Sequence, residues 1–169
     1  KYFNNFKITK CADINQNAAN KCAKINKIKA VTIKELLSDT DIKIILNLTI
    51  PAAHYEVAKQ ALLNGKHVYS EKPLAINFQD GKKLIKLAKK KKLYVGNAPD
   101  TFLGGGSQKS RDLLDKKVIG KVIFGHAIFA YPGIQSYHPN PESWFAKKGG
   151  GPVVDMGPYY LTALVNLLG

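Results

Sequence analysis

The chain has 169 residues, of which 45% are hydrophobic and 22% charged, and its formal net charge is +14. This balance is that of an ordinary globular protein and argues against disorder. No apolar run reaches the roughly 18 residues that a membrane-spanning helix needs. We therefore expect a soluble, cytoplasmic protein with no membrane partner.

The positive charge does not by itself indicate a nucleic-acid partner. Of the 26 Lys and Arg residues, only Arg111 is an arginine. Proteins that bind nucleic acids use Arg heavily, because its planar fork binds phosphates and bases in bidentate fashion. The run Lys89–Lys92 closes a predicted helix, where cations suit the helix dipole and solvent. We expect a solvated surface and no nucleic acid.

Cys11 and Cys22 are the two cysteines, and neither has the spacing of a metal ligand. We read them as reduced thiols of a cytoplasmic protein rather than as a disulfide. The sequence indicates no metal site.

Short strands and helices alternate through the first two-thirds of the chain, which is the pattern of a parallel α/β sheet. We expect strands at 8–12, 30–31, 42–48, 68–70 and 94–95, and helices at 15–25, 33–37, 51–63 and 78–90. The strand at 42–48 is nearly continuously apolar, as a strand buried on both faces is. Residues 1–117 are therefore predicted to form a Rossmann-type doubly wound sheet.

The pattern changes after residue 117. Residues 121–131 alternate like an antiparallel strand, 132–148 form a loop rich in Pro, Gly and aromatic residues, and 157–168 form a closing helix. Gly104–Gly106 are expected to be a hinge. Residues 118–169 are thus predicted to begin an α+β substrate domain. The chain begins with Lys1 instead of an initiator Met, and no Gly-rich phosphate turn precedes the first strand. Since the second domain is also only begun, we expect a chain cut short at both ends.

Two segments follow the predicted strands at 42–48 and 68–70, and both carry polar residues. The first is Thr49-Ile50-Pro51-Ala52-Ala53-His54, and the second is Gly65-Lys66-His67-Val68-Tyr69-Ser70-Glu71-Lys72-Pro73. Open α/β sheets bind ligands just beyond the carboxyl ends of their strands. Together these segments resemble the signature of the glucose–fructose oxidoreductase/inositol dehydrogenase/rhizopine catabolism (Gfo/Idh/MocA) family.

The resemblance implies roles for residues of both segments. Glu71 and Pro73 would shape the nicotinamide pocket, and Lys72 would carry the chemistry, as an ammonium that stabilises alkoxide charge and relays a proton. The implied contacts with the cofactor also include Thr49, Pro51, His54 and, after the strand at 94–95, Asn97. For His54, a polar residue at a helix N-terminus without a ligand is an equal alternative.

A third segment, Gly149 to Tyr160, resembles the family segment that brings substrate-domain groups over the nicotinamide. By this resemblance Tyr159 would pass a proton to the reacting hydroxyl, and Asp155 would hold a sugar hydroxyl or orient Lys72. Trp144 lies in the preceding loop, where it would stack on a sugar face or fill the domain interface.

Asp13 follows the first predicted strand, where a carboxylate can accept hydrogen bonds from an adenosine ribose. Ile14 and Asn15 follow it in place of an Arg that would neutralise a 2′-phosphate, so the cofactor is NAD or NADP, with NAD favoured.

The function implied by the resemblance is hydride transfer between the nicotinamide and a secondary alcohol of a sugar or polyol. Two alternatives use the same scaffold: an NAD-dependent glycosidase, and a cofactor-sensing regulator without turnover. We expect the full-length protein to form a homo-oligomer, and the chain by itself to bind NAD feebly and to be inactive, because the phosphate turn would be missing.

Overall fold

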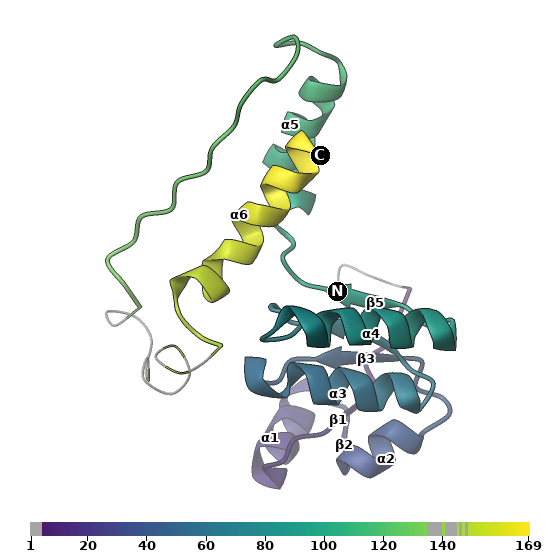
Figure 1. The fold of residues 1–169 in the computed structure, drawn as a ribbon. Coiled ribbons are helices and arrows are strands. Elements are labelled where there is room, and N and C mark those ends of the chain that lie inside the picture. The colour runs from purple at the N-terminus through teal and green to yellow at the C-terminus, as the bar shows by residue number, and fades with distance from the viewer. Residues whose placement is uncertain (1–4, 135–139, 141–144, 146, 148) are drawn as a thin grey trace.

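The computed structural model describes residues 5–134, 140, 145, 147 and 149–169. In chain order, its helices and strands are β1 (Lys10–Cys11), α1 (Gln16–Asn26), β2 (Lys29–Ala30), α2 (Ile33–Ser38), β3 (Ile44–Asn47), α3 (Pro51–Leu63), β4 (His67–Ser70), α4 (Phe78–Lys91), β5 (Val95–Asn97), the 3₁₀ helix η1 (Thr101–Leu103), α5 (Gly105–Asp115) and α6 (Pro152–Leu168). Figure 1 shows the helices α5 and α6 standing apart from the α/β part.

All strand pairs in the described residues are parallel. β1 pairs with β2, and β3, β4 and β5 form a second sheet in that order. Asn47, Ser70 and Asn97 are register partners across the second sheet, so its three strands end level with one another. The predicted Rossmann-type α/β fold is confirmed, and its strand ends meet along one edge.

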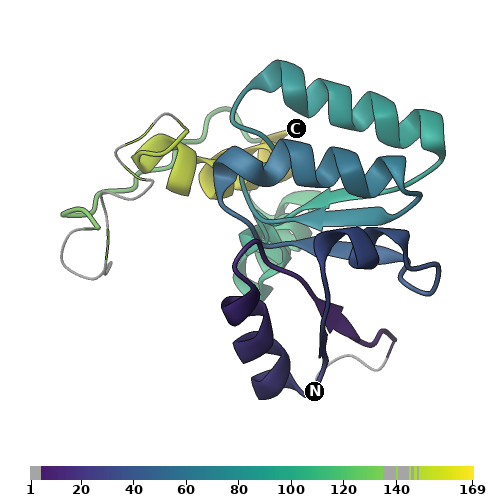
Figure 2. The same ribbon diagram turned by 90° about the horizontal axis from the view of Figure 1, so that it is seen from below.

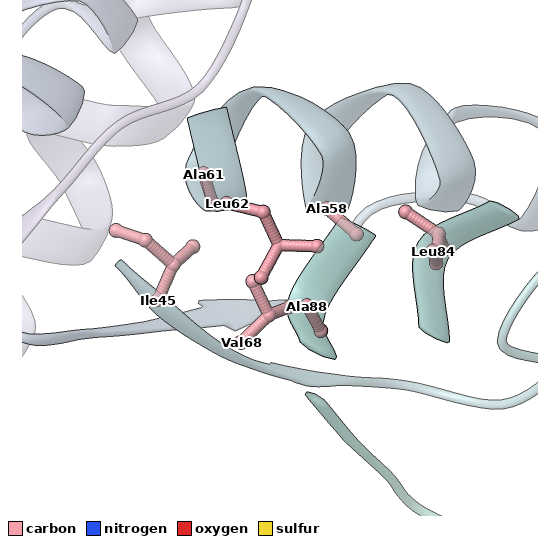
Figure 3. Packing of buried hydrophobic residues seen from close by; sticks show 7 residues of the cluster. All are labelled: Ile45, Ala58, Ala61, Leu62, Val68, Leu84 and Ala88. Carbon is pink, nitrogen blue, oxygen red and sulfur yellow. The ribbon is translucent and has the colours of Figure 1, made fainter. Parts of the chain in front are cut away.

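Helices α3 and α4 cover one face of the β3–β4–β5 sheet (Figures 1 and 2). The core lies between them and contains Ile45, Ala58, Ala61, Leu62, Val68, Leu84 and Ala88 (Figure 3). Three of these residues are alanines, and their small side chains let the helix backbones approach the sheet closely.

The opposite face of β3 differs from the prediction. The apolar run at 42–48 predicted a strand buried on both faces, but Ile44 is 53% and Leu46 47% exposed, while Ile45 is buried. Within the described residues, β3 is thus covered on one face only, and its side chains alternate accordingly.

Local capping explains why the helices begin and end where they do. The Asn15 side chain accepts the backbone N–H groups of Asn17 and Ala18 at the start of α1, and Thr32 and Glu35 form a capping box on α2. Asn77 caps α4 in the same way. These polar side chains satisfy N–H groups that a helix end leaves without partners.

Three predictions for the second part of the chain differ from the structure. The expected hinge at Gly104–Gly106 is the start of helix α5. Residues 121–131, predicted as an antiparallel strand, are irregular, because no strand of the described residues pairs with them. The closing helix starts at Pro152 rather than at 157, since Pro fits the first turn of a helix well.

Candidate active site

Polar side chains fix the loops that leave the ends of β3, β4 and β5. Asn47 donates from Nδ2 to the His54 carbonyl at 3.0 Å, and its Oδ1 accepts the Thr49 hydroxyl at 2.7 Å. Asn97 donates from Nδ2 to the carbonyls of Ser70 and Glu71, both at 2.9 Å. The loops after β3 and β4 are therefore each held by a side chain at the end of a strand, and sequence reasoning missed Asn47 among them.

Lys72 lies in the loop that Asn97 holds. Its peptide bond to Pro73 is cis, and its backbone N–H donates to Oε2 of Glu71 at 2.9 Å. Thus Glu71, one of the residues expected to line the cofactor pocket, shapes the backbone on which Lys72 is carried.

The amine of Lys72 reaches across to α6. Its Nζ is 2.5 Å from Oδ1 of Asp155 and 2.6 Å from the Asp155 carbonyl oxygen. The two side chains are only 14% and 17% exposed. A partly buried ion pair of this kind, which also has a backbone hydrogen bond, is screened by solvent much less than a surface pair.

Helix α6 explains how Asp155 and Tyr159 come to face the same amine. They are four residues apart on one helix and so lie on the same face. Asp155 is in the first turn, where a carboxylate is favoured by the helix dipole. The Lys72 amine also lies 5.3 Å from the centre of the Tyr159 ring, within the range of a cation–π contact.

Pro158 lies inside α6, between these two residues. Because proline has no N–H, it cannot donate to the Val154 carbonyl, which would be its helical partner. The carbonyl of Asp155, the next residue along the helix, accepts the Lys72 amine.

The electrostatic surroundings of Tyr159 favour a neutral phenol. Burial is the main cause that raises the pKa of Tyr159 above its ordinary value. The carboxylates of Glu71, Asp100 and Asp155 raise that pKa further, because a phenolate would face their negative charge. Asp100, which follows β5, is another residue that sequence reasoning did not single out, and no local signal marks it.

The structure does not bring every predicted residue to this cluster. Asp13 is exposed beyond the end of β1, where its Oδ1 accepts the Asn15 N–H at 2.8 Å. The contacts of the described residues do not join it to Lys72. Thr49 is exposed and Pro51 partly exposed, at the start of α3. Trp144 lies outside the described residues.

His54 lies close to these loops but offers no free ring nitrogen. It is 1% exposed, and its Nδ1 and Nε2 contact the backbone oxygens of Pro73 and Thr49. Both polar atoms of the ring are thus engaged by the protein itself. These contacts match the alternative of a polar residue near a helix N-terminus without a ligand, and direct contact of His54 with a cofactor stays a prediction.

Other kinds of site find no support in the part of the chain that the structure describes. No group of three or more His, Cys, Asp or Glu side chains could hold a metal ion there. No helix within those residues is both long enough and apolar enough to cross a bilayer.

Comparisons with known proteins show the family to which the chain belongs. Residues 1–98 match a family model described as an oxidoreductase family with an NAD-binding Rossmann fold, and residues 107–169 match the model of the GFO/IDH/MocA C-terminal domain. The chain belongs to the Gfo/Idh/MocA family of oxidoreductases. The family resemblance drawn from the two loop segments and from Gly149 to Tyr160 is therefore confirmed.

Similar proteins include dehydrogenases. A trans-1,2-dihydrobenzene-1,2-diol dehydrogenase from Xenopus laevis is 33% identical over 136 residues, which are 79% of this chain and 40% of that protein. A D-xylose dehydrogenase from Paenarthrobacter nicotinovorans is 26% identical over 144 residues, or 81% of this chain and 36% of the relative. The chain thus spans about two fifths of the length of these relatives.

A solved levoglucosan dehydrogenase, in complex with NADH and levoglucosan, has the same fold. Its TM-score is 0.81 at 22% sequence identity, over 95% of this chain and 44% of that one. At this identity the likeness shows the fold alone, and it covers the second part of the chain as well as the Rossmann part.

Proposed function

We propose that the whole protein transfers a hydride between a nicotinamide cofactor and a secondary alcohol of a sugar or polyol. The observation that carries the proposal is the cluster of Lys72, Asp155 and Tyr159 at the carboxyl ends of parallel strands. An amine, a carboxylate and a phenol that meet at such an edge can bind a hydroxyl group and move its proton.

The ion pair suggests how the proton is handled. In the pair with Asp155, Lys72 carries an ammonium, which can donate to the oxygen of the reacting carbon and stabilise negative charge on it. The oxidation of the alcohol would need Lys72 to start as a neutral amine, which takes the proton of the alcohol and becomes the ammonium. Asp155 orients the Lys72 side chain in both directions of the reaction.

Tyr159 acts in this proposal as a second donor. Because its pKa is raised, the phenol keeps its proton at neutral pH and donates a hydrogen bond to the same oxygen. This role is more limited than the proton transfer expected from the sequence. A phenol that resists ionisation is a poor base, so Tyr159 would donate a hydrogen bond without taking up a proton.

The residues at the strand ends fit a nicotinamide cofactor, which would accept or return the hydride when bound. The Asp13 carboxylate is exposed, and its Oδ1 accepts the Asn15 N–H, so in the part of the chain that the structure describes its Oδ2 can accept a ribose hydroxyl. Thr49, Glu71 and Asn97 border the same edge of the sheet as Lys72. Without a basic residue next to Asp13, NAD is favoured over NADP.

The names of the relatives support the substrate class. The matched dehydrogenases are named for a cyclic diol and for D-xylose, and the solved enzyme holds levoglucosan. All three are compounds with secondary hydroxyl groups. A polyhydroxylated ring or chain also suits a cluster that offers both donors and acceptors.

The test is to supply the whole protein with NAD or NADP and a panel of sugars and polyols, and to follow the absorbance of the reduced nicotinamide. Lys72→Ala should lower turnover about a hundredfold or more, because it removes the proton-transfer group. Lys89→Ala, on the last turn of α4, is the matched control and should leave turnover unchanged. Full activity of Lys72→Ala would remove Lys72 from the mechanism.

The same assay separates the two alternative functions. Net accumulation of reduced cofactor supports a dehydrogenase, whereas sugar cleavage without net reduction would indicate a glycosidase. Cofactor binding without turnover of any compound would indicate a regulator.

A further inference from the structure

His54 joins two loops that are distant in the sequence. Its Nε2 is 2.8 Å from the Thr49 carbonyl oxygen, in the loop after β3, and its Nδ1 is 2.6 Å from the Pro73 carbonyl oxygen, in the loop after β4. Its own carbonyl is held by Asn47 at 3.0 Å. One almost fully buried side chain thus connects the loop with Thr49 to the turn that carries Lys72.

The two contacts place a demand on the protons of the ring. A carbonyl oxygen can only accept a hydrogen bond, so each ring nitrogen must carry a hydrogen. A neutral imidazole has one N–H, and its other nitrogen would direct a lone pair at the second carbonyl. A buried carbonyl oxygen that is left without a hydrogen bond in this way costs free energy. The geometry therefore fits a ring that donates from both nitrogens, with two carbonyl dipoles that offset the burial of its charge.

His67 provides a contrast within the same chain. Its Nδ1 is 3.0 Å from the backbone nitrogen of Tyr94, which donates. That ring nitrogen must therefore be bare, and the proton of a neutral His67 must sit on Nε2. His67 begins β4, so it lies at the end of that strand away from Lys72.

We propose that His54 is a positioning residue that donates from both ring nitrogens and thereby fixes the Lys72 turn against the Thr49 loop. The carbonyl that it holds belongs to Pro73, the residue bonded directly to Lys72. Loss of this bond frees the backbone that aims the amine at Asp155. The effect on catalysis rests on the proposed function, but the protonation of the ring does not.

The first experiment measures the ring nitrogens of this chain by ¹⁵N NMR at neutral pH. Protonated and bare imidazole nitrogens differ widely in chemical shift, and the signals are assigned with His54→Gln and His67→Asn variants. We expect two protonated nitrogens for His54, and one protonated and one bare nitrogen for His67. A bare nitrogen on His54 would overturn the proposal, whether or not the protein is a dehydrogenase.

The second experiment separates the hydrogen bond to Pro73 from the hydrogen bond to Thr49. It uses two substitutions of His54, each of which can keep one of the two bonds. In His54→Asn the amide nitrogen takes the place of Nδ1 and can still donate to Pro73, whereas in His54→Gln it takes the place of Nε2 and can donate to Thr49. In the whole protein, His54→Asn should keep kcat within about threefold and raise the cofactor KM about tenfold. His54→Gln should keep that KM but lower kcat roughly ten- to a hundredfold, because a displaced catalytic group loses rate steeply.

The control is His67→Asn, whose side-chain oxygen can still accept the Tyr94 N–H, and it should change neither constant. Equal losses of kcat in both His54 variants would show a merely structural role and overturn the proposal. If the wild-type protein turns over no sugar or polyol, it is the proposed function that fails, and the NMR result still decides the role of the His54 ring.

Discussion

Lys72 and Asp155 are 83 positions apart in the chain, yet the amine of one lies 2.5 Å from the carboxylate of the other. The contact joins the loop after β4 to the first turn of α6. It thus unites the part of the chain that matches the Rossmann model with the part that matches the C-terminal model. The ion pair is the centre of the candidate site, and it is open to test.

Asp155→Asn should lower kcat about ten- to a hundredfold in the whole protein, because a misdirected amine loses much of its catalytic effect. The amide keeps the shape of the side chain, and the backbone carbonyl still accepts from Lys72, so the fold should be retained. The measurement is steady-state kinetics together with a circular dichroism spectrum. Asp112→Asn, which removes the two solvent-exposed pairs of Asp112 with Lys109 and Lys116, is the control and should leave kcat as it is. Equal kinetics for both variants would contradict a role for the Asp155 pair.

Tyr159→Phe tests the donor role of the phenol. The variant keeps the ring beside Lys72 but loses the hydroxyl, so kcat should fall roughly tenfold or more. Because the pKa of Tyr159 is raised, its phenol stays protonated below pH 10 and ionises only above that ordinary value. We consider the direction in which the carbonyl is reduced. If ionisation of this phenol lowers the rate, the fall should begin above about pH 10. The Tyr159→Phe variant should not show this fall. If the rate advantage of the wild type over Tyr159→Phe already disappeared near neutral pH, the donor role of Tyr159 would be contradicted.

Leu62→Ala tests the core beneath α3. Leu62 is 0% exposed and packs against Val68 of β4, so the variant should lose about 2–5 kcal/mol of unfolding free energy. Leu63, its neighbour in the sequence, is 45% exposed, and Leu63→Ala should cost about 0.5 kcal/mol or less. Chemical denaturation of both variants checks the difference. Similar costs for the two leucines would mean that α3 packs by another face.

Asp39 predicts a dependence of stability on pH. Its carboxylate accepts from Lys10, which is the main cause that lowers the pKa of Asp39 below 3.8, and the Asp41 N–H lowers it further. A carboxyl group with a lowered pKa in the folded state stabilises the protein above its ordinary pKa, and this contribution is lost as the pH falls through the folded value. Asp39→Asn should therefore be less stable than the wild type at neutral pH, and the difference should vanish in strong acid.

Denaturation midpoints across this pH range give the measurement for Asp39. Glu56→Gln is the comparison, because Glu56 also has a lowered pKa but, among the described residues, pairs with Lys59 and Gln60 of its own helix. Its effect should be smaller, since Asp39 also joins separate elements: Lys10 of β1 binds its side chain, and the buried Lys66 donates to its carbonyl. A difference that persists unchanged in strong acid would exclude the Asp39 carboxylate as its source.

The sequence by itself determined those features that depend on neighbours in the chain. Helices α3 and α4 were predicted to within a residue, because Pro51, Asn64-Gly65 and Asn77 mark helix ends through local backbone chemistry. The two loop segments and the Gly149–Tyr160 segment also identified the family, since motif and spacing are properties of the chain alone.

The tertiary structure decided which groups meet and which faces are covered. An apolar run cannot tell whether both faces of β3 are buried, and an alternating run at 121–131 becomes a strand only if a partner lies beside it. The same holds for the site: Asp100 beside Tyr159, and the two carbonyls on His54, come from loops that the fold brings together. Such contacts depend on the direction of each chain segment in space, which no local pattern of residues encodes.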